Sequence, residues 1–247
     1  MDIINSKCDH IFNKKLIINQ PESGYRFSVD ALLLSWFASQ IKNLNNCADL
    51  GCGSGIVGLS LLQKGVTKSL TGIEIQKTLF DFSVLNSKVN NLSESCSFMN
   101  FDIRDSHVHI LKEKSFELVV SNPPFWSKNM GRLSTDEQRR IARHELEGTL
   151  SDFARLAHRI MHPIKGRFCI AFPASRFNYL VDSLNRNSLY ISRIIPVYPL
   201  REKGAELLLV ESKCKQDPST VFAPPLYLKD ENNNDSEILK RIVAGEY

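Results

Sequence analysis

The chain has 247 residues, of which 43% are hydrophobic and 23% charged, and this length and composition suit one globular α/β domain with short additions at either end. Its net charge of +4 is only mildly basic, so the distribution of charge says more about partners than its size. No apolar run approaches the ~18 residues of a membrane-spanning helix, and the N-terminus lacks the layout of a signal peptide, so we expect a cytoplasmic protein without a membrane partner.

The first predicted elements are a helix, a strand and a second helix. Apolar residues recur at helical spacing over residues 27–40, and Ser28 can cap this amphipathic helix just before Asp30. A short strand follows over residues 47–50, and a helix over residues 56–64.

A glycine loop joins this strand to its helix, with Asp49, Gly51, Gly53 and Gly55 at alternate positions. Glycines let the main chain turn with positive φ and approach a ligand closely, and a helix N-terminus favours acceptor groups. Residues 53–58 also match G-x-G-x-x-G, which is typical of dehydrogenases. Asp49 argues against a dinucleotide, because its carboxylate would repel a pyrophosphate and attract an ammonium group. No large separate substrate domain follows, which also disfavours a dehydrogenase.

Further strands are predicted at residues 69–75, 96–101 and 116–121, with a long helix after the first of them. Alternating strands and helices imply parallel βαβ units. The last of these strands ends in Asn-Pro-Pro-Phe, which consists of Asn122, Pro123, Pro124 and Phe125.

This acceptor corner, residues 122–125, has an unusual backbone. Neither proline has an N–H, and Asn122 precedes a proline and is held extended, so the strand stops here. The corner offers an amide side chain, a main-chain carbonyl and an aromatic ring, which suit a planar group carrying an NH₂. Alone, the motif could equally be a tight turn with a surface phenylalanine.

A polar, basic segment follows the corner. Residues 126–148 predict a long loop, and such a loop inside a compact domain is usually functional. Between Lys128 and Arg167 there are nine Lys/Arg against five Asp/Glu. The segment suits phosphate contact with a nucleic acid, although a solvated helix face of mixed charge is the alternative. The candidate RNA-binding residues are Lys128, Arg132, Arg139, Arg140 and Arg143.

The remaining elements complete the sheet. Ser151 can cap a helix before the next strand. The last two strands have no helix between them and should be antiparallel. The elements are a strand at 167–172, a helix at 174–185 and strands at 189–197 and 205–210. We therefore expect an α/β fold with a doubly wound, seven-stranded, mostly parallel sheet and an antiparallel terminal hairpin.

Cysteines and histidines do not indicate a metal site. The six cysteines lack a C-x-x-C pair and are expected as small core residues of a reducing compartment. The histidines provide only the pair His107 and His109, so we expect no metal.

Together, the glycine loop and the acceptor corner resemble the motif pair of S-adenosylmethionine-dependent amino-methyltransferases, which have the class I, Rossmann-like fold. Through residues 25–34, 71–76, 143–145 and 226–230, nearly the whole chain is similar to the bacterial valine-tRNA adenine N6-methyltransferase family, which modifies the adenine beside the anticodon. Phe125 departs from the tyrosine that relatives often carry; stacking survives and a phenolic hydrogen bond is lost. The resemblance implies S-adenosylmethionine as cofactor and tRNA as the partner, with no obligate protein partner.

Ligands of doubly wound sheets bind beyond the carboxyl ends of the strands. At these ends Glu74 can accept from ribose hydroxyls, and Asp102 from the adenine amine of the cofactor, with Ile103 along the ring. The resemblance places Ser28 and Asp30 near the methionine moiety. Asn122 and the Pro123 carbonyl would accept from the attacking nitrogen.

Two alternatives stay open. A glutamine N5-methyltransferase acting on a protein uses the same corner, but its relatives carry a sizeable helical N-terminal domain. A non-catalytic RNA-binding protein would have no physical need for the corner. We expect residues 1–45 to cover the cofactor pocket, residues 46–215 to form the methyltransferase domain and residues 216–247 to pack on it as a tail.

Overall fold

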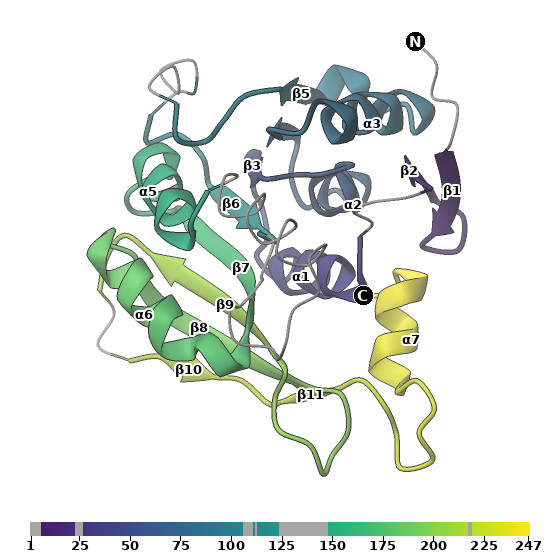
Figure 1. Ribbon diagram of the computed structural model, residues 1–247, viewed down its shortest axis with the longest axis vertical. Helices are drawn as coiled ribbons and strands as arrows, with labels where there is room; N and C mark the ends of the chain where they lie inside the picture. Colours follow the sequence, from purple (N-terminus) through teal and green to yellow (C-terminus); the bar gives the residue numbers. More distant parts are fainter. Residues whose placement is uncertain (1–5, 23–26, 106–110, 112, 124–147, 217–218) are drawn as a thin grey trace, which may run out of the picture.

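The computed structural model describes residues 6–22, 27–105, 111, 113–123, 148–216 and 219–247 (Figure 1). A nine-stranded sheet crosses the molecule in the order β10-β8-β9-β7-β6-β3-β4-β5, with β11 also pairing β8. Its strands are β3 (Asn46–Leu50), β4 (Ser69–Ile73), β5 (Cys96–Met99), β6 (Leu118–Ser121), β7 (Arg167–Pro173), β8 (Tyr190–Tyr198), β9 (Leu207–Lys213), β10 (Val221–Phe222) and β11 (Leu226–Tyr227).

The pairing confirms the expected sheet. Strands β3, β4, β5, β6 and β7 run parallel, whereas β9 is antiparallel to both β7 and β8, as the missing helix between β8 and β9 requires. The sheet has two strands more than the seven expected, because the C-terminal tail adds the short β10 and β11 along β8.

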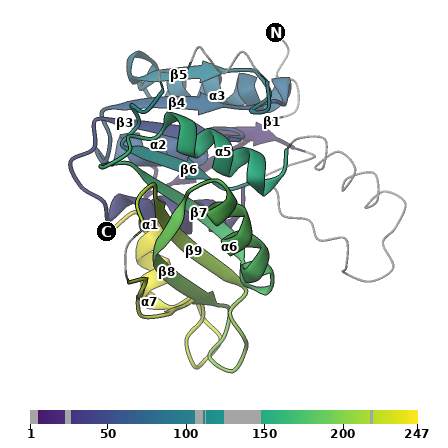
Figure 2. The ribbon, with the colours of Figure 1, turned by 90° about the vertical axis from the view of Figure 1, so that its left-hand side faces the viewer.

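Helices cover both faces of the sheet, and the buried strand residues divide between two cores. Figure 2 shows α5 (Leu150–Ile160) and α6 (Phe177–Arg186) in front of the sheet. Helices α1 (Val29–Ser39), α2 (Ile56–Gln63) and α7 (Glu237–Ala244) pack on the other face, while α3 (Lys77–Val89) packs near β5. Successive residues of β6 alternate between the cores, which is why Leu118, Val119 and Val120 are all apolar.

Helix α1 is more buried than its sequence predicts. Eight of its eleven residues are buried, because α2, α7 and the strands β7 and β9 surround it. Ser28 occupies the N-cap position as expected, but its side chain makes no capping hydrogen bond. The expectation of an amphipathic helix is therefore wrong: α1 is a core helix between other elements.

An N-terminal hairpin, which the sequence analysis did not foresee, consists of β1 (Ser6–Ile11) and β2 (Leu16–Pro21). Its turn reaches α7, since the Phe12 N–H donates to the Val243 carbonyl at 3.3 Å. Figure 1 shows the hairpin beside α3 and close to the yellow C-terminal helix. The first and last described segments therefore pack against each other.

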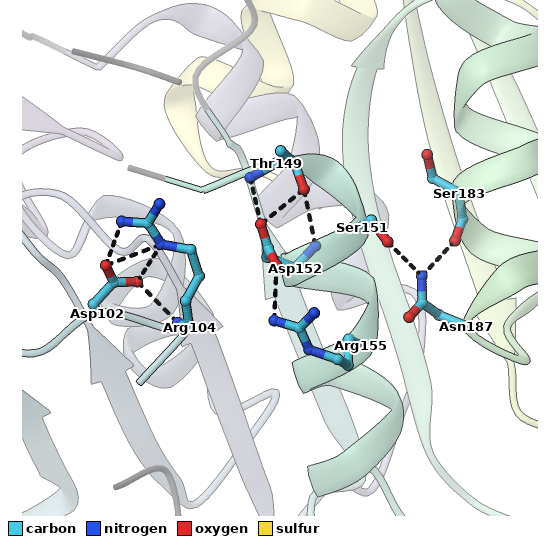
Figure 3. Close-up of polar contacts among 8 residues, drawn as sticks. All are labelled: Asp102, Arg104, Thr149, Ser151, Asp152, Arg155, Ser183 and Asn187. Carbon is cyan, nitrogen blue, oxygen red and sulfur yellow. Dashed lines mark hydrogen bonds and ion pairs between the residues drawn. The ribbon is translucent and has the colours of Figure 1, made fainter. Parts of the chain in front are cut away.

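Helix α5 begins earlier than expected, at a capping box formed by Thr149 and Asp152 (Figure 3). The Thr149 hydroxyl accepts from the Asp152 N–H at 3.3 Å, and the Asp152 carboxylate accepts from the Thr149 N–H at 2.9 Å. This corrects the prediction that Ser151 caps the helix. Ser151 instead accepts from the Asn187 side chain at 3.0 Å and links α5 to the end of α6.

All six cysteines lie in the described part and are reduced. Cys8 is exposed on β1, whereas burial raises the pKa of the Cys47, Cys52 and Cys169 thiols and brings that of Cys96 to about 11. Within the described ranges, no group of three His, Cys, Asp or Glu side chains is placed to hold a metal ion. The helices of the same ranges are too short or too polar to cross a membrane.

Candidate active site

The glycine loop after β3 adopts the backbone that its sequence predicts. Gly51, Gly53 and Gly55 have φ values of 69°, 56° and 87°, a region that favours glycine. The N–H groups of Gly51 and Cys52 both donate to the Ile73 carbonyl at 2.9 Å, which ties the loop to the carboxyl end of β4. The loop therefore starts helix α2 at a fixed place between two strand ends.

Glu74, at the end of β4, is 5% exposed and lies against this loop. One carboxylate oxygen accepts from the Gly53 N–H at 2.8 Å, and the other accepts from the Gln76 N–H at 2.8 Å. The predicted contact of Glu74 with ribose hydroxyls stays a prediction. What the structure adds is that the same carboxylate fixes the middle glycine of the loop.

Asp49 lies near the end of β3, just before the glycine loop, and is buried. Its side chain is 1% exposed, and Oδ2 accepts from the Gly58 N–H of α2 at 2.9 Å. Burial raises the pKa of Asp49 to about 7; the Gly58 hydrogen bond lowers it and the nearby charge of Glu74 raises it. The carboxyl group thus faces the helix backbone and not the surface, and the expected attraction of the cofactor's ammonium group stays a prediction.

Asn86 of α3 holds the glycine loop from the opposite side. Its amide nitrogen donates to the Ser54 and Asn19 carbonyls, both at 2.9 Å, and its oxygen accepts from the Asn19 N–H at 2.8 Å. Asn90, one turn later, donates to the Ile17 carbonyl at 2.7 Å and accepts from the Ile17 N–H at 2.8 Å. The two side chains therefore form hydrogen bonds with the edge of β2 that faces away from β1. In this way they connect the hairpin to the glycine loop.

Asp102 and Ile103 lie beyond the carboxyl end of β5, near the start of α5. The Asp102 carboxylate accepts hydrogen bonds from the Arg104 side chain, whose Nε lies 2.9 and 3.0 Å from its two oxygens (Figure 3). This pairing lowers the pKa of Asp102. Ile103 is 7% exposed, and its side chain lies beside Gly148. An adenine amine that binds Asp102 would have to share its oxygens with Arg104.

Ser28 and Asp30 lie together at the start of α1. Burial raises the pKa of Asp30, and a hydrogen bond from Ser28 partly offsets that rise. Residue Phe27 is held from the hairpin side, because its N–H donates to the Gln20 side chain at 3.1 Å. The expected contact of Ser28 and Asp30 with a methionine moiety stays a prediction.

The acceptor corner begins beside the glycine loop. Strands β3 and β6 are parallel neighbours, with Asp49 opposite Val120, so the same register places Asn122 level with Gly51. Asn122 is half-buried and Pro123 buried. Among the described residues no hydrogen bond engages the Asn122 side chain. Outside the described residues lie Pro124, Phe125, Lys128, Arg132, Arg139, Arg140 and Arg143.

Four neighbouring strands thus bring their carboxyl ends to one edge. They carry a left-handed glycine loop with a buried glutamate, an aspartate next to an apolar side chain, and an asparagine that starts a Pro-Pro corner. Carboxylates and an apolar face suit the hydroxyls, amine and ring of a nucleoside, and the corner suits a nitrogen acceptor next to it. This arrangement matches the chemistry of group transfer from a nucleoside cofactor to a nitrogen.

Residues 28–144 match the family model of the methyltransferase small domain. A tRNA1(Val) (adenine(37)-N6)-methyltransferase from Porphyromonas gingivalis is 29% identical over 202 residues, which cover 80% of this chain and 78% of that protein. An enzyme of the same name from a Flavobacteriaceae bacterium is 24% identical over 221 residues, covering 87% of this chain and 91% of the relative.

The fold is also that of solved methyltransferases. A predicted O-methyltransferase from Agrobacterium tumefaciens has a TM-score of 0.67 at 19% identity, covering 87% of this chain and 96% of the other. The glycine loop, Glu74, Asp102 and Asn122 all lie inside the region matched to the family model, and the dehydrogenase interpretation of residues 53–58 is set aside. The chain is a methyltransferase, and its residues 28–144 are similar to the methyltransferase small domain.

Proposed function

We propose that this chain uses S-adenosylmethionine to methylate the N6 nitrogen of an adenine in tRNA, namely adenine 37 of valine tRNA, in the cytoplasm. The observation that carries this proposal is the position of Asn122, which the register of β3 and β6 sets level with Gly51 of the glycine loop. The names of the relatives, which are methyltransferases of that adenine, support the choice of substrate.

The described residues fit this cofactor. The positive-φ glycines and the carboxylate of Glu74 would hold its nucleoside, while Asp102 and Ile103 would take the adenine, and Ser28 with Asp30 the methionine end. When bound, S-adenosylmethionine supplies the methyl group from its sulfonium. Asp49 holds the loop and α2 together through the Gly58 N–H, and its charge would attract the ammonium group of the cofactor.

On the acceptor side, Asn122 and the Pro123 carbonyl would each accept one N–H bond from the adenine amine. An aromatic amine is a poor nucleophile because its lone pair is delocalised into the ring. Two acceptors held at a fixed corner favour a tetrahedral nitrogen with a free lone pair, so they stabilise the transition state more than the ground state. The proton that the nitrogen loses after transfer leaves to solvent.

The remaining parts of the proposal concern the RNA. An adenine inside a structured loop must be unstacked to enter a corner of this kind, where Phe125 would stack on it. The basic residues after the corner would contact the neighbouring phosphates. The hairpin and α1 would cover the cofactor pocket as an N-terminal extension, residues 46–215 would form the catalytic domain, and the tail would brace its edge.

Labelled S-adenosylmethionine tests the substrate. The purified chain is incubated with separate tRNA, ribosomal RNA and protein fractions, and the labelled position is mapped. We expect label in tRNA at an N6-methyladenine beside the anticodon. Label that appears in protein on a glutamine, with none in tRNA, would replace this proposal by the glutamine N5-methyltransferase.

The acceptor corner is tested by Asn122→Ala. Because the side chain acts on the acceptor nitrogen, we expect kcat to fall by roughly a hundredfold or more, with the Kd for S-adenosylhomocysteine unchanged. Asn178→Ala, at an exposed position of α6, is the matched control and should keep full activity. A variant that methylates tRNA at nearly the wild-type rate would refute the role of Asn122.

A further inference from the structure

The carboxyl ends of β3 and β6 are joined by one side-chain hydrogen bond. Ser121 ends β6 and is fully buried, and its hydroxyl donates to the Leu50 carbonyl at 2.8 Å. The backbone register of the two strands runs to Asp49 and Val120, so this bond adds a contact one residue beyond it. The bond lies where β3 and β6 each leave the sheet.

Both partners of this bond stand next to a group of the active site. Leu50 precedes Gly51, where the cofactor loop begins, and Ser121 precedes Asn122, where the acceptor corner begins. On the other side of the loop, the Ile73 carbonyl and Glu74 fix Gly51 and Gly53. The Ser121 bond therefore connects the acceptor half of the site to a loop that is already held.

We propose that Ser121 is a positioning residue, whose hydroxyl sets the separation of the acceptor corner and the cofactor loop. This inference rests on the proposed methyl transfer. In an in-line displacement the reacting atoms must approach along one line, and an error of about 1 Å can lower the rate by about a hundredfold. The Ser121 bond fixes the separation of the two strands at the place where their ladder ends.

The sheet contains a matched control. Ser212 of β9 is also fully buried, and its hydroxyl lies 3.5 Å from the Phe168 carbonyl of the neighbouring β7. Phe168 is near the start of β7, so the Ser212 hydroxyl lies at the amino end of the parallel strands, whereas the active site lies at their carboxyl ends. Ser121→Ala and Ser212→Ala remove the same hydroxyl group from equally buried positions. Only Ser121 lies between the cofactor loop and the acceptor corner.

The experiment measures kcat, the KM for tRNA, the Kd for S-adenosylhomocysteine and Tm for both variants. We expect Ser121→Ala to lower kcat about tenfold or more, while KM and Kd stay within about threefold. Ser212→Ala should keep kcat within about twofold, even if the two Tm values fall equally. Ser121→Thr, which keeps the hydroxyl, should recover most of the lost kcat.

An unchanged kcat in Ser121→Ala, or an equal loss of kcat in the two alanine variants, would overturn the inference. Failure of the proposed function looks different, because the wild-type chain itself would then leave tRNA unlabelled. In that case the same variants are compared on the fraction that does become labelled. The expected ratio of kcat values is the same there, since Ser121 acts on the corner and not on the nucleic acid.

Discussion

The buried carboxyl group of Asp49 makes the stability of this fold depend on pH. Its ordinary pKa of 3.8 rises to about 7 in the folded chain, chiefly because of burial. Between these values the folded chain keeps a proton that the unfolded chain releases. The proton on Asp49 therefore stabilises the folded chain fully below pH 3.8, and this stabilisation is lost as the pH rises through about 7.

Asp49→Asn should weaken this dependence. The amide cannot ionise, and its oxygen can still accept from Gly58, so we expect the free energy of unfolding to fall less between about pH 5 and about pH 8 than in the wild type. Urea denaturation across that range measures it. Asp182→Asn, which changes a carboxyl group 54% exposed on α6, serves as control and should keep the wild-type slope. A variant of Asp49 with an undiminished slope would contradict the assignment.

At the residue scale, a motif predicts where a side chain stands more reliably than where it points. Asp49, Glu74, Asp102 and Asn122 all occur at strand ends, as the sequence predicts. Which of them faces a ligand depends on contacts with the elements packed around each strand end. Asp49 is turned inward by the N–H of Gly58, and no local pattern contains that information.

Helix α2 packs so closely on β4 that a glycine is needed in its first turn. A Cβ built on Gly58 would lie 2.5 and 2.7 Å from the two methyl groups of Leu70, which is itself 2% exposed. Gly58→Ala should therefore destabilise the fold by about 1–3 kcal/mol, although alanine is the better helix former. Denaturant unfolding measures the change.

The control for this substitution is Gly204→Ala in the turn between β8 and β9. A Cβ at that position meets no atom within 4 Å, so its free energy of unfolding should stay close to that of the wild type. If Gly58→Ala proves as stable as Gly204→Ala, the close contact between α2 and β4 is not needed for stability.

At the scale of elements, the sequence predicts the strands of the central sheet and most helices, because their apolar runs are long and buried. The sequence does not predict the hairpin of β1 and β2, because contacts with residues far away in the chain hold it in place. The far edge of β2 is bonded by Asn86 and Asn90, which lie about 70 residues away in the chain. Two asparagines four residues apart on one face of a helix were the available signal. The two-residue strands of the tail are too short for any pattern.

At the scale of the whole molecule, the sheet divides between two tasks. The half from β3 to β5 carries the glycine loop, Glu74 and Asp102, which are proposed for the cofactor. In the other half, β6 ends at the acceptor corner, and β7, β9 and β8 lie beyond it in the sheet. The alternation of strands and helices sufficed to predict this doubly wound plan. The contact between the hairpin and α7 was beyond sequence reasoning, since it joins segments that are more than 200 residues apart.

The charge of the segment after the corner predicts how RNA binding responds to salt. A variant with Arg139, Arg140 and Arg143 all replaced by alanine should bind tRNA more weakly, and its salt slope should fall by about one unit for each lost phosphate contact. The position of the methylated base should not change. Filter binding across a salt series measures the slope.

The matched control removes three exposed positive charges from other surfaces, at Lys68, Lys88 and Arg186. It should keep the wild-type slope. If both triple variants bind tRNA as the wild type does, the basic segment is ordinary surface, and the protein-substrate alternative returns.

The distribution of cysteines supplies a chemical handle on one element. Cys8, on the hairpin, is exposed, whereas the other five thiols are buried or half-buried and have raised pKa values. A maleimide dye at neutral pH should therefore react with Cys8 first, because the reactive form is an accessible thiolate. A fluorophore placed there without any mutation would report optically whether the hairpin stays docked on α3 while ligands bind and leave.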